Sequence, residues 1–375
     1  MRPIQMVDLF NQYNKIKGEI DSAINNVLTS SKFIKGAEVE LFEKELADYL
    51  KVKHVISCAN GTDALMIALL ALDLKENDEI IVPSFSFVAT AEVVPLLKLK
   101  PVFADIDPYS YNIDTYQLKD LINTRAKAII PVHLFGQSAY MEVILKIAND
   151  HNLFVIEDAA QSLGCDYIFD NKKIKKTGTL GNIGCTSFFP SKNLGCFGDG
   201  GALFTDDDYL AEKIRMIANH GSTKKYYHEM IGINSRLDTI QAAILRVKLR
   251  YLDQYNKKRQ EVANYYYENL KNIDEIILPK KEEYSTHIFN QFTIRVKEGK
   301  RDKLKDFLSK NDIPTMIYYP LPLHLQPAFR LYAKTKEIME SEKASSEVLS
   351  LPMHTELDDE QLLYITQKIK EFYYQ

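Results

Sequence analysis

Short apolar runs alternate with amphipathic stretches of helical length from about Glu38 to Leu252. Such short runs are typical of buried strands, and the stretches between them are typical of helices that cover a sheet. The expected strands are His54–Cys58, Glu79–Val82, Lys100–Ala104, Ala128–Pro131 and Phe154–Glu157. The expected helices are Asp63–Leu72, Val88–Leu97, Thr115–Ile122 and Met141–His151. This alternation predicts an α/β fold with a large, mostly parallel sheet covered by helices on both faces.

The pattern changes near residue 252. Helix Leu237–Leu252 is expected to close the α/β layer, and Asp253–Leu270 has the pattern of a long, highly charged connecting helix. A strand, a helix, a Pro-rich loop and a terminal helix are expected beyond it, at Phe289–Val296, Lys300–Asn311, 319–323 and from Asp358 onward. We therefore expect a large α/β domain over residues 1–252 and a smaller C-terminal α+β domain over residues 253–375.

The composition is that of an ordinary globular protein, with 375 residues, 46% hydrophobic and 26% charged. The net charge of −4 does not favour nucleic acid or an anionic membrane as a partner. The apolar runs are strand-sized, far short of the ~20 residues of a membrane helix. The first residues lack the layout of a secretion signal, so we expect a cytoplasmic protein.

Several kinds of chemistry find no motif in the chain. The four cysteines have no Cys-x-x-Cys pair and are expected to be reduced core residues, without a metal site. They are Cys58, Cys165, Cys185 and Cys196. The glycines from Gly178 to Gly201 do not have the spacing and context of a dinucleotide-binding fingerprint, and no phosphate-binding loop of the nucleotide hydrolases is present.

Asn60, Gly61 and Thr62 join an expected strand to an expected helix. This geometry points free backbone N–H groups and the positive end of the helix above the sheet, which suits a phosphate. A simple helix start with a glycine in the turn is at least as good an interpretation of this motif alone.

Asp158 ends a buried-looking strand, at the sheet edge where open α/β folds bind ligands. Period-2 alternation puts Ile156 and Asp158 on one face and Glu157 on the other. Gln161 follows closely enough to touch the same ligand. A lone acid could equally cap the next helix.

Lys192 is the most informative residue. It is the only charged side chain between residues 177 and 198, where a chain of this composition would place about 6, so the segment is expected to be buried. A buried lysine has a lowered pKa and reacts well with carbonyl groups. A lysine that snorkels to solvent is the common alternative, but it suits this apolar context poorly. Phosphate site, acid and buried lysine together are suited to pyridoxal 5′-phosphate.

The chain resembles the pyridoxal phosphate-dependent sugar aminotransferases of the DegT/DnrJ/EryC/StrS family, which have the fold of aspartate aminotransferase (fold type I). Matching segments occur in family order over nearly all of the chain. They are Phe33–Gly36, Asn60–Leu65, Pro83–Ala91, Val155–Ser162, Ser187–Gly195, Gly198–Ala202 and Asn234–Asp238.

The resemblance implies roles for individual residues. Lys192 would bind the cofactor covalently and act as general base, and Asp158 would pair with its pyridinium nitrogen. The other implied cofactor contacts are Gln161 to the ring hydroxyl, Phe87 stacked on the ring, and Gly61, Thr62, Ser187 and the neighbouring subunit's Asn234 at the phosphate. The implied sugar ligands are Arg236, Tyr318, Tyr319 and His324. A homodimer with shared active sites is therefore expected.

The implied activity is transfer of an amino group from L-glutamate to a keto carbon of a nucleotide-linked sugar. Most similar are the 3-aminotransferases of UDP-2-acetamido-2-deoxy-3-oxo-glucuronate, which serve surface polysaccharide synthesis. Tyr318-Tyr319-Pro320 departs from the His-Tyr-Pro of some of those enzymes. Arg236 could bind the uronate carboxylate, or instead pair with Asp238 or brace the dimer. A dTDP-3-keto-6-deoxyhexose 3-aminotransferase and a non-transaminating or regulatory relative remain alternatives.

Overall fold

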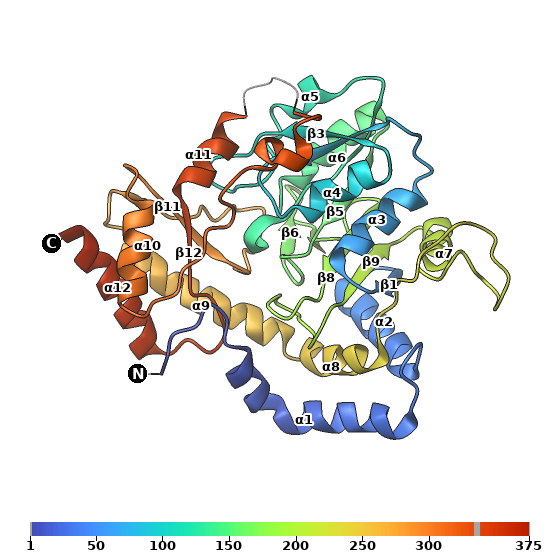
Figure 1. Ribbon diagram of the computed structural model, residues 1–375, viewed down its shortest axis with the longest axis horizontal. Coiled ribbons are helices and arrows are strands. Elements are labelled where there is room, and N and C mark those ends of the chain that lie inside the picture. The colour runs from blue at the N-terminus through green and yellow to red at the C-terminus, as the bar shows by residue number, and fades with distance from the viewer. Residues whose placement is uncertain (1, 334–337, 375) are drawn as a thin grey trace.

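The structure is a computed structural model that describes residues 2–333 and 338–374 (Figure 1). Its main feature is a seven-stranded sheet in the order β1-β9-β8-β5-β4-β2-β3. The pairs from β3 through β2, β4 and β5 to β8 are parallel, whereas β9 runs antiparallel to β8 and β1. The strands are β1 (His54–Cys58), β2 (Glu79–Pro83), β3 (Lys100–Ala104), β4 (Ala126–Ile129), β5 (Phe154–Asp158), β8 (Ile183–Ser187) and β9 (Gly201–Thr205). The expected mostly parallel sheet is confirmed.

Helices cover both faces of this sheet because the strand side chains alternate between two cores. Ile80 and Val82 of β2 pack with α3, α4 and α7, while Ile81 packs on the other side with α6. Helix α1 lies along α8 on the outside (Figure 1). The helices are α1 (Leu9–Ser30), α2 (Ala37–Leu50), α3 (Gly61–Ala71), α4 (Ala89–Leu96), α5 (Leu118–Leu121), α6 (Met141–His151), α7 (Asp208–Ile217) and α8 (Thr239–Leu249).

A second core lies in the C-terminal part, where helices pack on a three-stranded sheet in the order β10-β11-β12. Its elements are α9 (Leu252–Leu270), β10 (Ile276–Ile277), β11 (Phe292–Val296), α10 (Arg301–Lys310), α11 (Met339–Glu347), β12 (Val348–Leu351) and α12 (Asp359–Tyr374). Ile4, from the other end of the chain, belongs to this core. The expected boundary at residue 252 coincides with the start of α9 and stays a prediction.

Several expected elements have different bounds. Strand β4 ends at Ile129, before Pro131, which has no N–H to give to a ladder. The expected helix over 115–122 is reduced to the single turn α5. The Asp114 side chain accepts from the Tyr116 N–H at 2.9 Å and forms a tight turn just ahead of it.

The expected strand from Phe289 begins only at Phe292, as β11, because Phe289 has a φ of 48°, which lies outside the strand region. The short hairpin β6 (Asp166–Ile168) and β7 (Ile174–Lys176) was not expected. Within the described ranges no helix is both long enough and apolar enough to cross a membrane. The four cysteines are free and buried, as expected.

Candidate active site

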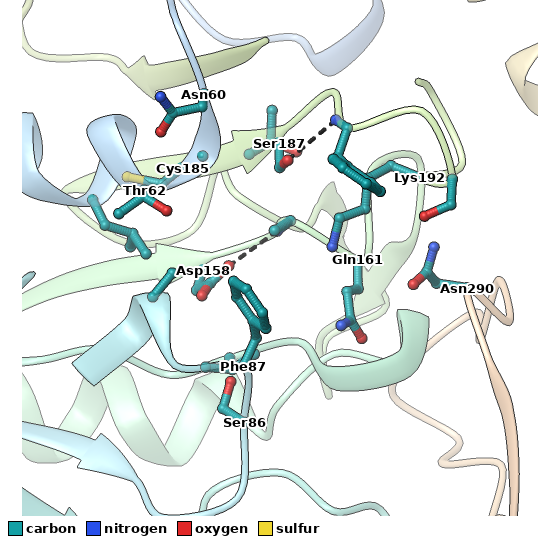
Figure 2. A pocket seen from close by; sticks show the side chains of 18 of the residues that line it. Asn60, Thr62, Ser86, Phe87, Asp158, Gln161, Cys185, Ser187, Lys192 and Asn290 are labelled. Carbon is teal, nitrogen blue, oxygen red and sulfur yellow. Dashed lines mark hydrogen bonds between the residues drawn. The ribbon is translucent and has the colours of Figure 1, made fainter. Parts of the chain in front are cut away.

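A cavity of about 800 Å³ opens where strands β5 and β8 end, beside the N-terminus of α3 (Figure 2). Strand β5 supplies Asp158, β8 supplies Ser187, and the loop after β8 supplies Lys192. Ligands of α/β sheets bind at the carboxyl ends of parallel strands. Residues that are far apart in the sequence therefore meet at the edge of the sheet suited to binding.

The N-terminus of α3 forms one end of the cavity. Asn60 caps the helix by accepting from the Asp63 N–H at 2.8 Å, whereas the N–H groups of Gly61 and Thr62 have no acceptor within the described ranges. A Cβ at Gly61 would lie 2.7 Å from the Ser187 Cβ, so only glycine allows the helix this close to β8. The free N–H groups of Gly61 and Thr62 and the hydroxyls of Thr62 and Ser187 thus lie at the end of the cavity that is suited to a phosphate.

Asp158 has both carboxylate oxygens held. Oδ2 accepts from the Thr90 hydroxyl at 2.7 Å, and Oδ1 accepts from the Ala160 N–H at 3.1 Å. Its neighbour Glu157 points to the opposite face, where three backbone N–H groups donate to it at 2.6 to 2.8 Å. The predicted alternation along β5 is therefore confirmed, and Asp158 is fixed in direction at the cavity.

Aromatic rings and one amide form another wall. Gln161 Oε1 accepts from the Phe135 N–H at 2.6 Å, and Gln161 Nε2 donates to the Tyr319 hydroxyl at 3.3 Å. Phe87 is 54% exposed, with its ring centroid 6.4 Å from that of Tyr319. An exposed ring at a cavity can stack on a flat ligand. Tyr318 lines the cavity as well. Four expected contacts are thus at the cavity, and their roles stay predictions.

The Lys192 side chain points into the cavity (Figure 2). Burial lowers its pKa to about 8, against the opposing effect of the Asp158 charge. A lysine with a lowered pKa has more neutral amine near pH 7 and is a better nucleophile. The expectation that its whole segment is buried is wrong at Phe189 and Phe197, which are 52% and 41% exposed, and Lys192 itself is partly exposed. Phe189 lines the cavity, and Phe197 lies edge-on to Tyr13 of α1.

The cavity has few positive charges. Of its lining residues in the described part of the chain, Lys192 is the only lysine, arginine or histidine, whereas Asp63, Asp158 and Asp199 are acidic. Ligands with a diphosphate or several carboxylates are normally held by additional cations. The walls of this cavity do not provide them.

Asn234 and Arg236 lie outside the cavity, on an extended segment. Asn234 is exposed, Ser235 is buried and Arg236 is partly exposed, which is the expected alternation. Arg236 borders a second pocket of about 220 Å³ together with Lys35. No carboxylate within 2–333 and 338–374 pairs with Arg236, so the expected alternative, an ion pair with Asp238, is not formed there.

His324 is not among the residues that line the cavity. Its Nδ1 bonds to the Ser84 hydroxyl, and its Nε2 lies 3.1 Å from a Glu342 carboxylate oxygen. These two partners hold the ring beside the end of β2, away from the other predicted sugar ligands. Both ring nitrogens are already used within the fold, and the structure does not bring this residue to the site.

Three residues at or behind the cavity were not expected from the sequence. Thr90 reaches Asp158 across 68 positions, and Asn290 reaches Asn193 across 97 positions. Asn290 and Gln291 line the cavity and interrupt the apolar run of residues 288–294. A polar pair inside an apolar stretch was the one available signal.

Pyridoxal 5′-phosphate fits this set of residues. Its phosphate would bind at the α3 terminus, its ring would lie against Phe87, and Asp158 would pair with the ring nitrogen, leaving the carbonyl to Lys192. The orphaned N–H groups of α3 and the free amine of Lys192 each match one functional group of that molecule. No cluster of side chains suited to a metal ion occurs among the described residues.

Comparisons with known proteins agree with this chemistry. The family model described as the DegT/DnrJ/EryC1/StrS aminotransferase family matches residues 14–370. A "Pleiotropic regulatory protein" of Geobacillus stearothermophilus is 48% identical over 99% of this chain and 98% of its own length. The UDP-2-acetamido-2-deoxy-3-oxo-D-glucuronate aminotransferase of Pseudomonas aeruginosa is 46% identical over 95% of this chain and 96% of its own.

Among solved structures, NtdA from Bacillus subtilis with bound cofactor PMP is similar in fold, with a TM-score of 0.90. It is 33% identical, and the match covers 99% of this chain and 83% of that one. The cofactor of the present chain is pyridoxal 5′-phosphate, and its fold is that of the fold type I aminotransferases. The chain belongs to the DegT/DnrJ/EryC1/StrS aminotransferase family.

Proposed function

We propose that this nucleotide-sugar aminotransferase moves an amino group from L-glutamate to C3 of UDP-2-acetamido-2-deoxy-3-oxo-glucuronate. The product would be a 2,3-diamino uronic acid unit for surface polysaccharide. The similarity to the Pseudomonas enzyme supports the substrate, since 46% identity extends over nearly the whole length of both chains. The single structural observation that carries the proposal is Arg236, a cation without a carboxylate partner in the described residues.

The residues of the cavity divide the chemistry between them. When bound, the cofactor supplies an electron sink that stabilises negative charge on carbon. Neutral Lys192 Nζ would carry the α-proton of glutamate to the cofactor carbon that bears the transferred amine in the first half-reaction, and it would carry a proton from that carbon to the sugar carbon in the second. Asp158 holds a proton on the ring nitrogen throughout. The α3 terminus and Ser187 retain the phosphate, so the reacting atoms stay in place between the two halves.

A homodimer with shared sites is part of the proposal. The sugar nucleotide carries a diphosphate and a carboxylate, yet Lys192 is the one cation among the described residues of the cavity wall. Asn234 and Arg236 point outward from a segment of the same chain that lies outside this cavity. A second copy that places these residues over the cavity would supply the missing cation and the remaining phosphate ligand.

Arg236 would then recognise the C6 carboxylate. Its planar guanidinium can bind a carboxylate through two parallel hydrogen bonds, whereas a 6-deoxyhexose presents a methyl group there. Lys35 lies on the same pocket, and its pKa is lowered by burial and by the nearby Arg236. Glu40, Glu43 and Arg215 line this pocket too, and Glu43 pairs with Arg215 at 2.9 Å, so Lys35 and Arg236 are its cations that no carboxylate of the described residues pairs with. The reaction is proposed to take place in the cytoplasm, which the four free cysteines support.

The deciding experiment is incubation of the purified protein with L-glutamate and a panel of keto-sugar nucleotides, with mass spectrometry of the products. The expected result is amination of the UDP-linked 3-oxo uronate and release of 2-oxoglutarate. Efficient amination of a dTDP-3-keto-6-deoxyhexose instead would replace the substrate assignment. If glutamate fails to aminate the bound cofactor, the regulatory alternative would gain support.

A further inference from the structure

Asn193, the residue after Lys192, lies in a chain of three buried asparagines, each no more than 5% exposed. Asn193 Nδ2 donates to Asn256 Oδ1 at 2.6 Å and to the Ile288 carbonyl at 3.3 Å. Asn193 Oδ1 accepts from Asn290 Nδ2 at 2.9 Å. Both ends of this amide are therefore satisfied, as burial requires.

The direction of the chain of amides is determined by two backbone carbonyls. Asn256 Nδ2 donates to the Leu163 carbonyl at 3.3 Å, and Asn193 Nδ2 donates to the Ile288 carbonyl. A carbonyl only accepts, so each amide has one workable orientation. Reversing Asn193 would place its oxygen against two other oxygens. Gly164 (φ 94°) leaves room for the hydrogen bond between Asn256 and the Leu163 carbonyl, because a Cβ at Gly164 would lie 2.6 Å from Asn256 Nδ2.

Helix α9 holds both ends of this bridge. Asn256 lies on α9, and Arg259 follows one turn later on the same helix. Arg259 is buried, and its guanidinium donates to the carbonyls of Phe289 and Asn290 at 3.2 and 3.3 Å. Helix α9 is therefore hydrogen-bonded to the loop of Lys192 through Asn256, and to the segment of Asn290 through Arg259.

These contacts form a closed ring. From α9 it passes through Asn193, beside Lys192, to Asn290 in the cavity wall and back to α9 through Arg259. Figure 2 shows Asn290 and Lys192 as parts of the same cavity wall. A closed ring restricts each member more than an open chain would, because a shift in one contact strains the others. The covalent neighbour of Lys192 is thereby tied to two other elements.

We propose that Asn193 is a positioning residue, which holds the Lys192 amine in place by closing a buried ring of hydrogen bonds between α9 and the cavity wall. The inference concerns the lysine alone and needs no sugar substrate. If this inference fails, the proposed substrate is not affected. If the proposed substrate is wrong, the inference about Lys192 is not affected either.

The test measures the ionisation of single lysines in the full-length chain after removal of the cofactor. Competitive labelling with acetic anhydride across a pH series, read by peptide mass spectrometry, gives the apparent pKa of Lys192. The same samples report Lys248, a buried lysine whose pKa is also lowered to about 8 and which donates to the Gly195 carbonyl at 2.5 Å. Lys248 contacts the same loop but none of the three asparagines, so it serves as the internal control.

Asn193→Leu removes the bridge, and Asn256→Leu breaks it at a residue that does not line the cavity. Gln361→Met is the matched control, since it removes an equally buried amide that donates to the Arg2 and Pro3 carbonyls, outside the ring. In both leucine variants we expect the pKa of Lys192 to rise by about one unit or more towards its ordinary value, because a loosened loop admits water. In Gln361→Met, and at Lys248 in every variant, the lysine pKa should stay unchanged.

The holoenzyme gives a second readout, the pH at which the absorption band of the bound cofactor titrates. This midpoint should move in the leucine variants and stay in place in Gln361→Met. An unchanged Lys192 pKa in the leucine variants would overturn the proposal. Equal changes in the pKa of Lys192 and of Lys248 would also overturn it, because they would indicate a general loosening of the fold. If Asn193→Leu does not fold, Asn256→Leu and Gln361→Met decide the question by themselves.

Discussion

The Thr90 hydroxyl donates a 2.7 Å hydrogen bond to Asp158 Oδ2, so a fully buried side chain of α4 orients the acid that faces the cavity. Thr90 itself is not part of the cavity wall. The contact joins the first helical turn after the Phe87 loop to the end of β5. It sets the direction in which Asp158 can meet the ring nitrogen of the cofactor.

Removing this hydroxyl should slow catalysis without emptying the site. We expect Thr90→Val to lower kcat about 10- to 100-fold, because a hydrogen bond to an ionised group is worth about 1.5–3 kcal/mol. Thr90→Ser keeps the hydroxyl and should remain close to the parent enzyme. Steady-state kinetics of the glutamate half-reaction provides the measurement. Equal rates for the valine and serine variants would show that the contact has no catalytic role.

Asp158→Asn tests the acid directly. The amide cannot keep the pyridine nitrogen protonated, so turnover should fall by orders of magnitude. Lys192 remains available in this variant, and borohydride should still fix the cofactor to it covalently. The measurements are turnover and the mass of the labelled peptide. A variant that keeps near-parental turnover would remove Asp158 from the mechanism.

The lowered pKa of Lys192 predicts a pH profile. With a pKa of about 8, the amine is mostly protonated below pH 8 and mostly neutral above it. The rate at which cofactor-free protein binds pyridoxal phosphate should therefore rise with pH up to about 8 and then level off. Stopped-flow absorbance follows this reaction, with Lys192→Ala as the control. A rate that continues to rise to pH 10 would indicate an ordinary, solvated lysine.

Mixing inactive variants tests the shared site. If Asn234 serves the partner's cofactor, Lys192→Ala and Asn234→Ala subunits should complement each other after exchange. Random exchange makes about half of the dimers mixed, each with one of its two sites intact, so about a quarter of the sites should work. Activity is measured before and after exchange. If no activity returns although mixed dimers are present by mass spectrometry, each site is built within one chain.

Arg236→Leu tests recognition of the uronate. Losing one partner of a buried charge pair should cost on the order of 2–5 kcal/mol in kcat/KM for the sugar half-reaction. The glutamate half-reaction should stay nearly intact. Rapid-mixing absorbance separates the two halves. Equal damage to both would assign Arg236 a structural role in place of sugar recognition.

The residues that could be predicted are those with a local signal. Lys192 is conspicuous as a lone charge in an uncharged segment, and Asp158 follows from strand alternation. Both properties involve neighbours in the sequence, which set burial and direction over a few residues.

The contacts that escaped prediction join distant parts of the chain. Thr90 and Asp158, or Asn193 and Asn290, meet only after the sheet and α9 have brought them together. The resemblance suggested His324 as a sugar ligand, but its ring is held by Ser84 and Glu342. No pattern of hydrophobic and polar positions could have shown which side chains the His324 ring would contact.

The N-terminal segment has a consequence for folding during synthesis. Ile4 belongs to the core of α9, α10 and α12, and the Arg2 side chain donates to the Glu356 carbonyl, 354 positions later. As the chain leaves the ribosome, the strands of the large sheet, which all lie between residues 54 and 205, can pair first. Arg2 and Ile4 must therefore wait for the segment around Glu356 before they find their place. Removing these two residues would weaken the core of α9, α10 and α12, although it leaves the large sheet intact.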